Sequence, residues 1–181
     1  MIKLEKSILR QHIKEIKKST SKMRLENDSI LIMQRLERHP LFNSSNTILL
    51  YHSLPDEPNT HTLIEKWYLQ KTILLPVIDG TDLIVCKYTG IENTNRKNAY
   101  SILEPSITNK YTTFEQIDLA IIPGVAFDSQ GFRLGRGKGY YDKLFSDSRL
   151  ANIYKIGVCF DFQKLKFIPT QAWDLQVNEV I

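Results

Sequence analysis

The stretch DLAIIPGVAFDSQGFRLGRGKGYYDKLF, residues 118–145, combines three kinds of local pattern. Its first part, 118–127, is an apolar run typical of a buried strand. Its last part, from Tyr140, has the spacing of a helix. The loop between them carries glycine at every second position from 135 to 139. A strand that leads through a loop into a helix is the repeating unit of α/β folds, so this stretch favours that class.

Segments of the same two kinds alternate along the rest of the chain. Strand candidates are short apolar runs, at 47–51, 71–78, 82–88 and 154–160, and a turn through Asp79 and Gly80 joins 71–78 to 82–88. Helix candidates show apolar residues at helical spacing, at 4–18, 25–38, 60–70 and 140–150. Continuous apolar strands between helices indicate a mostly parallel sheet that is covered on both faces. We therefore predict a single-domain three-layer α/β/α sandwich over 1–181, with a Rossmann-like sheet.

Composition places the chain among ordinary globular proteins. Its 181 residues are 42% hydrophobic and 24% charged, which is enough apolar material for a real core. No apolar run approaches the roughly 20 residues that cross a bilayer, and the first residues carry charge throughout. The two cysteines, Cys86 and Cys159, are expected to be buried thiols in a reducing compartment. We expect a cytoplasmic protein without a membrane partner.

Positive charge is concentrated at the start of the chain. The net charge is +4 and the isoelectric point about 9.0, which suits nucleic acid or a small polyanion. Residues 1–24 alone have a net charge of +6. Lys6 and Arg10 lie four residues apart, so a helix presents both on one face. A binding face and a merely solvated face both remain open for this helix.

The glycine-containing loop has the chemistry of an anion site. Glycine lets the backbone approach a ligand, and successive exposed N–H groups form a concavity that binds anions. Arg133, Arg136 and Lys138 add full positive charges, and a helix that begins near Tyr140 adds a partial one. Asp142 follows at a place where it could offer an oxygen to Mg²⁺. The pattern favours a polyphosphate.

This loop matches neither common phosphate motif. It lacks GxxxxGK[ST], and its third glycine comes one residue too early for GxGxxG. A flexible basic turn and an RNA-contacting loop remain alternatives from the residues alone. An RNA-binding module predicts a broad basic surface and an affinity that falls steeply with salt.

The segment IIPGVAFDSQGFRLGRGKGYYDKLF, 121–145, closely resembles the signature of the 5-formyltetrahydrofolate cyclo-ligase (methenyltetrahydrofolate synthetase) family. The similarity extends over nearly the whole chain. Supporting segments are KSILR (6–10), LPDEPNT (54–60), YSILEP (100–105), IGVCFDFQ (156–163) and IPTQAWDLQVNEVI (168–181).

The resemblance implies an ATP- and Mg²⁺-dependent enzyme that converts 5-formyltetrahydrofolate to 5,10-methenyltetrahydrofolate and releases ADP and phosphate. In that family's reaction the formyl oxygen is phosphorylated, N10 attacks the activated carbon, the ring closes and phosphate leaves. Phosphoryl transfer depends on positioning and charge stabilisation more than on protein nucleophiles. The implied partners are ATP and the folate, with no nucleic acid, and we expect a monomer.

The resemblance also implies roles for residues that match the family's motifs. ATP is expected to contact Lys6, Arg10, Arg133, Gly135, Arg136, Gly137, Lys138 and Gly139. The folate is expected to contact Leu54, Glu57, Tyr100 and Tyr140. Mg²⁺ is expected at Asp142 and Asp174, and catalysis is expected to depend on Arg136, Lys138 and Tyr140.

Two positions depart from the family pattern. Trp173 stands where many members have histidine, and Ala99 stands where glycine is common. A related ATP-using or sugar-phosphate enzyme on a similar α/β fold is a further alternative.

Overall fold

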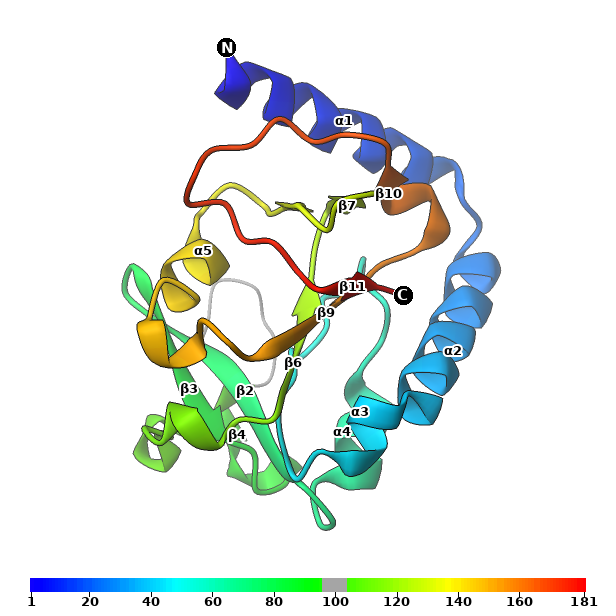
Figure 1. Ribbon diagram of the computed structural model, residues 1–181. Helices are drawn as coiled ribbons and strands as arrows, with labels where there is room; N and C mark the ends of the chain where they lie inside the picture. Colours follow the sequence, from blue (N-terminus) through cyan, green and yellow to red (C-terminus); the bar gives the residue numbers. More distant parts are fainter. Residues whose placement is uncertain (96–103) are drawn as a thin grey trace.

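A computed structural model describes residues 1–95 and 104–181 of the chain (Figure 1). Its centre is a six-stranded sheet in the order β11-β9-β6-β1-β2-β3. The strands are β1 (Thr47–Leu49), β2 (Thr72–Asp79), β3 (Asp82–Lys87), β6 (Leu119–Pro123), β9 (Tyr154–Val158) and β11 (Glu179–Val180). Every neighbouring pair is parallel except β2–β3. The predicted mostly parallel sheet is confirmed.

The antiparallel pair is the hairpin expected around Asp79 and Gly80. Its last register pair joins Asp79 to Asp82. Gly80, in the turn, has a φ of 61°, a left-handed conformation that glycine adopts without steric cost. This hairpin forms one edge of the sheet and reaches toward the cavity described below.

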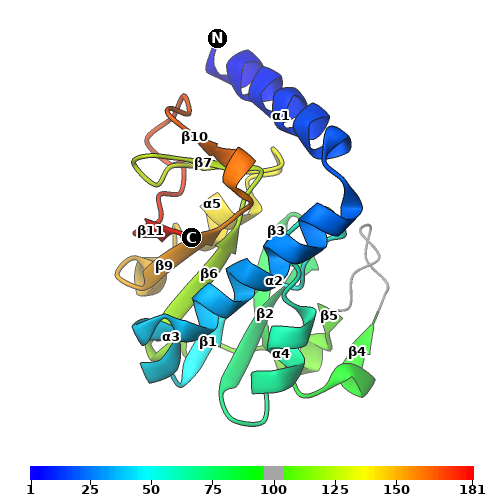
Figure 2. The same ribbon diagram turned by 90° about the vertical axis from the view of Figure 1, so that its right-hand side faces the viewer.

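Helices cover both faces of the central sheet, as the sandwich prediction requires. One face carries α2 (Lys22–Arg38), α3 (Pro40–Ser44) and α4 (His61–Trp67), which lie in front of the sheet in Figure 2. The other face carries α5 (Tyr140–Leu144) and the 3-10 helix η4 (Ser148–Leu150). Successive side chains of a strand point to opposite faces of the sheet, so one strand contributes to both cores. In β1, Ile48 packs in the core beneath α2–α4 and Leu49 in the core beneath α5.

The helix predicted over 140–150 is shorter than expected. It ends at Leu144, and a separate 3-10 helix begins after Asp147. The Asp147 side chain accepts a hydrogen bond from the Arg149 amide at 3.0 Å. Because aspartate favours this capping arrangement over the helix interior, it starts a new turn instead of continuing α5.

A second, small sheet was not predicted from the sequence. The expected strand 118–127 divides into β6 and β7 (Ala126–Asp128), and β7 pairs with β8 (Arg133–Leu134) and β10 (Lys164–Leu165). The long α1 (Ile2–Ser19) packs on this sheet, where Ile13 joins a cluster with Ala126, Leu134 and Ile168 (Figure 1). The packing holds the basic helix beside the glycine-containing loop.

Short elements complete the described chain. They are β4 (Thr94–Asn95), β5 (Glu104–Pro105), η1 (Ile91–Asn93), η2 (Ile107–Asn109), η3 (Phe114–Gln116) and η5 (Asp161–Gln163). No helix within the described ranges is long and apolar enough to cross a membrane. Cys86 and Cys159 are free and buried, and burial raises the pKa of Cys86 to about 11 and that of Cys159 to about 12.

Candidate active site

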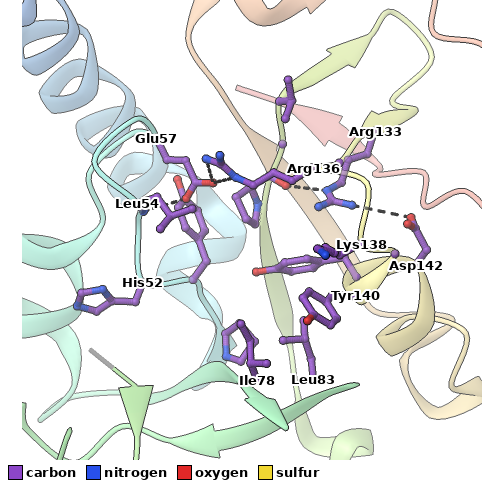
Figure 3. Close-up of a pocket in the computed structure, with 18 of the residues that line it drawn as sticks. His52, Leu54, Glu57, Ile78, Leu83, Arg133, Arg136, Lys138, Tyr140 and Asp142 are labelled. Atoms are coloured by element: carbon purple, nitrogen blue, oxygen red, sulfur yellow. Dashed lines mark hydrogen bonds and ion pairs between the residues drawn. The ribbon is translucent and has the colours of Figure 1, made fainter. Parts of the chain in front are cut away.

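A cavity opens at the carboxyl ends of β1 and β6, which are neighbours in the sheet. The chain leaves β1 through α4 to reach β2 on one side, and leaves β6 through α5 to reach β9 on the other. Such a reversal of strand order is where open α/β sheets bind ligands. The cavity encloses about 850 Å³ including its open mouth, and its lining includes residues that follow β1, β6 and β8 (Figure 3).

Arg133 is fixed in the wall of this cavity. Its Nε donates to the Pro123 carbonyl at 2.7 Å, and its guanidinium lies 4.7 Å from the centre of the Tyr141 ring. One terminal nitrogen is 3.8 Å from a carboxylate oxygen of Asp142. Burial lowers the pKa of Arg133, while Asp142 and Tyr141 act in the opposite direction. With 8% of the side chain exposed, Arg133 shapes the site from within the protein.

Arg136 comes from the same loop but crosses the cavity to the segment after β1. Its terminal nitrogen is 2.5 Å from Asp56 and 2.9 Å from Glu57 (Figure 3). Glu57 also accepts a hydrogen bond from the Leu54 amide at 3.0 Å. Burial raises the pKa of Asp56, but the Arg136 hydrogen bond and the Lys17 charge outweigh it, so the net direction is downward. Ion pairs of Asp56 with Lys17 and Arg136 thus connect α1, the 54–57 segment and the glycine-containing loop.

Of the two cations expected on α1, Arg10 contacts the glycine-containing loop and Lys6 pairs with Asp174. Arg10 donates from Nε to the Gly135 carbonyl at 2.7 Å. A side chain at Gly137 would begin 3.6 Å from the Arg10 guanidinium carbon, and Gly137 itself has a φ of 97°. Lys138 is exposed at the cavity and forms no hydrogen bond or ion pair with any described residue. Among the described residues, Lys138 is thus a loop cation without a counter-charge, whereas Arg133 and Arg136 are both paired with carboxylates.

The two expected metal-binding aspartates lie on neighbouring segments. Asp142 accepts from the Leu175 amide at 3.1 Å, which is the residue after Asp174. Asp174 forms an ion pair with Lys6 and accepts from the Gln171 amide at 2.6 Å. Within 1–95 and 104–181, no three His, Cys, Asp or Glu side chains gather closely enough to hold a metal by themselves. Two carboxylates suit Mg²⁺ that arrives with phosphate oxygens as its other ligands.

Most of the residues expected at the site meet at this cavity. Leu54, Glu57, Arg133, Gly135, Arg136, Lys138, Gly139, Tyr140 and Asp142 line it. Lys6, Arg10, Gly137 and Asp174 are joined to this group by the contacts given above. Tyr100 and Ala99 lie outside the described residues.

Several residues in the lining, or paired with it as Asp56 is with Arg136, were not predicted. Asp56 adjoins Glu57 in sequence, so the motif around Glu57 could have indicated it, and Tyr141 adjoins Tyr140 in the same way. Ile78 and Leu83, which flank the β2–β3 turn, gave no local signal. Their role in the lining depends on how the hairpin packs against α5, which local sequence does not encode.

Residues 2–181 match the model of the family described as the 5-formyltetrahydrofolate cyclo-ligase family. The chain belongs to this family. It is therefore an enzyme of the cyclising ligase type.

Cyclo-ligase relatives and solved structures are similar to this chain over most of its length. A probable 5-formyltetrahydrofolate cyclo-ligase of Schizosaccharomyces pombe is 30% identical over 87% of this chain and 84% of its own length. The cyclo-ligase of Mus musculus is 27% identical over 96% and 91%. The 5,10-methenyltetrahydrofolate synthetase structure of Aquifex aeolicus is 30% identical with a TM-score of 0.84, over 97% of this chain and 88% of that one. That of Mycoplasma pneumoniae is 25% identical with a TM-score of 0.73, over 97% of each chain.

Proposed function

We propose that this protein converts 5-formyltetrahydrofolate to 5,10-methenyltetrahydrofolate and cleaves ATP to ADP and phosphate. The observation that carries the proposal is the convergence of cations on one cavity whose opposite wall holds Glu57. Lys6 and Arg10 come from α1, and Lys138 comes from the glycine-containing loop. This arrangement offers a triphosphate site and a folate site side by side.

Phosphate would lie along the glycine-containing loop. Gly135, Gly137 and Gly139 leave the backbone accessible. Arg10 holds the loop by a hydrogen bond from its Nε to the Gly135 carbonyl. Lys138 has no counter-charge among the described residues, so it can meet a phosphate without breaking an existing ion pair. Arg136 would add a second charge after leaving the carboxylates, and together the two cations would stabilise the transferring phosphoryl group.

The folate would lie on the side of Glu57. One Glu57 oxygen is oriented by the Leu54 amide and the other faces Arg136. A carboxylate held in this way can accept hydrogen bonds from the 2-amino-pyrimidinone edge of a pterin. Apolar contacts from Ile78 and Leu83 would cover the rings, and Tyr140 lies next to Leu83 and Lys138, across the cavity from Glu57 (Figure 3).

Mg²⁺ would be held by Asp142 and Asp174 together with phosphate oxygens of ATP. When bound, the ion supplies positive charge that offsets the charge of the phosphates. Asp174 would have to exchange Lys6 for the ion, and Lys6 would then be free to contact phosphate.

The protein's task in the reaction is to bring two substrates together and to stabilise charge. The bond between the γ-phosphorus and ADP breaks as the formyl oxygen forms a new bond to that phosphorus. N10 then attacks the formyl carbon and loses its proton, and the carbon–oxygen bond breaks as phosphate leaves. Arg136 and Lys138 are the cations placed to stabilise the phosphoryl group in the first step and the departing phosphate in the last.

We also propose that the protein acts as a single-domain monomer in the cytoplasm, with small molecules as its ligands. Lys6, Lys17 and Arg136 each pair with an acidic side chain. This pattern supports a small polyanion over nucleic acid, because phosphate-backbone binding relies on an open basic surface.

The proposed function is tested by mixing the protein with Mg²⁺, ATP and 5-formyltetrahydrofolate and following the near-ultraviolet absorbance of the methenyl product. We expect an ATP-dependent increase that Lys138→Ala reduces roughly 10²-fold, as for the loss of one charge-stabilising donor. Lys143→Ala is the matched control, since Lys143 pairs with Asp82 and does not line the cavity. No ATP-dependent product at high enzyme concentration would overturn the proposal.

A further inference from the structure

Trp173 is held in solvent on a well-anchored turn. Its side chain is 68% exposed, and Trp173 and Phe167 are the only exposed Phe, Tyr or Trp residues in the described part of the chain. The turn is closed by a hydrogen bond from the Asp174 amide to the Gln171 carbonyl at 3.0 Å. Large aromatic side chains are usually buried, so an indole kept in water on a fixed turn calls for an explanation.

The anchors of this turn are the residues assigned to the phosphate end of the site. Asp174 pairs with Lys6 of α1, and the Leu175 amide donates to Asp142 at 3.1 Å. The segment that follows β10 thus passes between α1 and α5 (Figure 1), and its contact with Asp142 joins it to the lining of the cavity. Trp173 is next in sequence to Asp174, so an exposed indole adjoins a residue of the charged cluster.

We propose that Trp173 forms the platform on which the purine base of the nucleotide stacks. The inference rests on the proposed function, which places a triphosphate against Lys6, Arg10 and Lys138. In this arrangement the base of the nucleotide extends outward from the cluster, and Trp173 is the exposed aromatic residue next to Asp174. Stacking on an aromatic ring is a general way to bind a base and needs no hydrogen bonds to the base edges.

This role has a definite consequence for selectivity. A stacking platform recognises the flat face of the base, which adenine and guanine share. We therefore expect Trp173 to add affinity for purine nucleoside triphosphates and to add none for inorganic tripolyphosphate, which has the same phosphates without a base.

The experiment uses the fluorescence of Trp173 itself. Trp67 is the other tryptophan; its Nε1 donates to Glu37 at 2.7 Å and its ring lies edge-on to Phe42, away from the cavity. Trp67→Phe therefore leaves Trp173 as the sole reporter. We expect saturable quenching by Mg²⁺–ATP without folate, no quenching by Mg²⁺–tripolyphosphate, and reversal of the ATP signal when tripolyphosphate is added in excess.

Affinity in the full chain with Trp67 present provides the second measurement. By calorimetry, Trp173→Ala should weaken ATP binding about tenfold and leave tripolyphosphate binding unchanged, and Trp173→Phe should retain most of the affinity. Phe167→Ala is the matched control, because Phe167 is 70% exposed on the same segment but adjoins Lys166, whose carbonyl accepts a hydrogen bond from the Ser129 hydroxyl. In turnover, Trp173→Ala should raise KM for ATP with little change in kcat, the pattern of lost uniform binding.

The outcomes separate this inference from the proposed function. Equal ATP affinity in Trp173→Ala and the unaltered chain, or equal quenching by ATP and tripolyphosphate, would overturn the platform even if methenyl product forms normally. Base-dependent quenching without methenyl product would support the platform and overturn the proposed reaction, since the titration contains no folate.

Discussion

Arg133 and Arg136 are three residues apart and both line the cavity, yet one is buried and the other is partly exposed. Arg133 is buried against the Pro123 carbonyl at the end of β6 and the Tyr141 ring of α5. Arg136 is partly exposed and held by the carboxylates of Asp56 and Glu57 across the cavity. The same residue type therefore gives the site its shape at one position and, at the other, a charge that can change partners when ligands bind.

Replacement of the buried arginine should have the largest effect. Arg133→Ala removes a hydrogen-bonded cation from the interior and leaves Asp142 and Tyr141 without their neighbour. We expect the free energy of unfolding to fall by about 3 kcal/mol, as when one partner of a buried pair is lost. Urea unfolding measures it, and activity should fall with it. A loss below about 1 kcal/mol would show that Arg133 is not part of the rigid wall.

Replacement of the more exposed arginine, Arg136, should affect turnover much more than stability. Arg136→Ala removes partly solvated ion pairs, so we expect less than about 1 kcal/mol change in unfolding free energy. Turnover should nevertheless fall roughly 10²-fold, because a charge-stabilising donor is lost. Unfolding and steady-state assays on the same preparation test both expectations. Normal turnover would remove Arg136 from the chemistry.

The two carboxylates that hold Arg136 should be separable by their effects on substrate binding. Glu57→Gln is expected to raise KM for 5-formyltetrahydrofolate about tenfold, because it replaces one of the two acceptor oxygens that would face the pterin donors with a donor NH2 group. Asp56→Asn, the matched change at the adjacent residue, should affect this KM much less. Equal changes in the two variants would indicate that both carboxylates act only by holding Arg136.

The smallest expected effect is on stability in acid. Because the pKa of Asp56 is lowered in the folded protein, its pairs stabilise the fold above the ordinary aspartate value of about 3.9. That contribution is lost as the pH falls through the lower folded pKa. Urea midpoints should therefore be lower for Asp56→Asn than for the unaltered chain at about pH 6, and the difference should shrink as the pH falls through the lowered pKa of Asp56. A constant difference at every pH would contradict this assignment.

Prediction from sequence succeeded where structure follows from local pattern. The strands at 47–51, 71–78 and 154–160 were placed within a few residues because apolar runs bounded by turn residues indicate buried strands. The Asp79–Gly80 turn followed from glycine's tolerance of positive φ. The end of α5 and the division of 118–127 into β6 and β7 were missed, because they depend on the cap at Asp147 and on pairing with β8.

The sequence by itself determined the α/β class, the position of the glycine-containing loop after a buried strand, and the family. These features depend on periodicity, on turn chemistry and on a contiguous motif, all of which are local. Only the tertiary structure decided which charges meet. Lys6 reaches Asp174 across 168 positions of sequence, and Arg136 reaches Glu57 across 79. Such pairs form because α1 packs on the small sheet and the segment after β1 faces the loop after β8, and no local pattern encodes either arrangement.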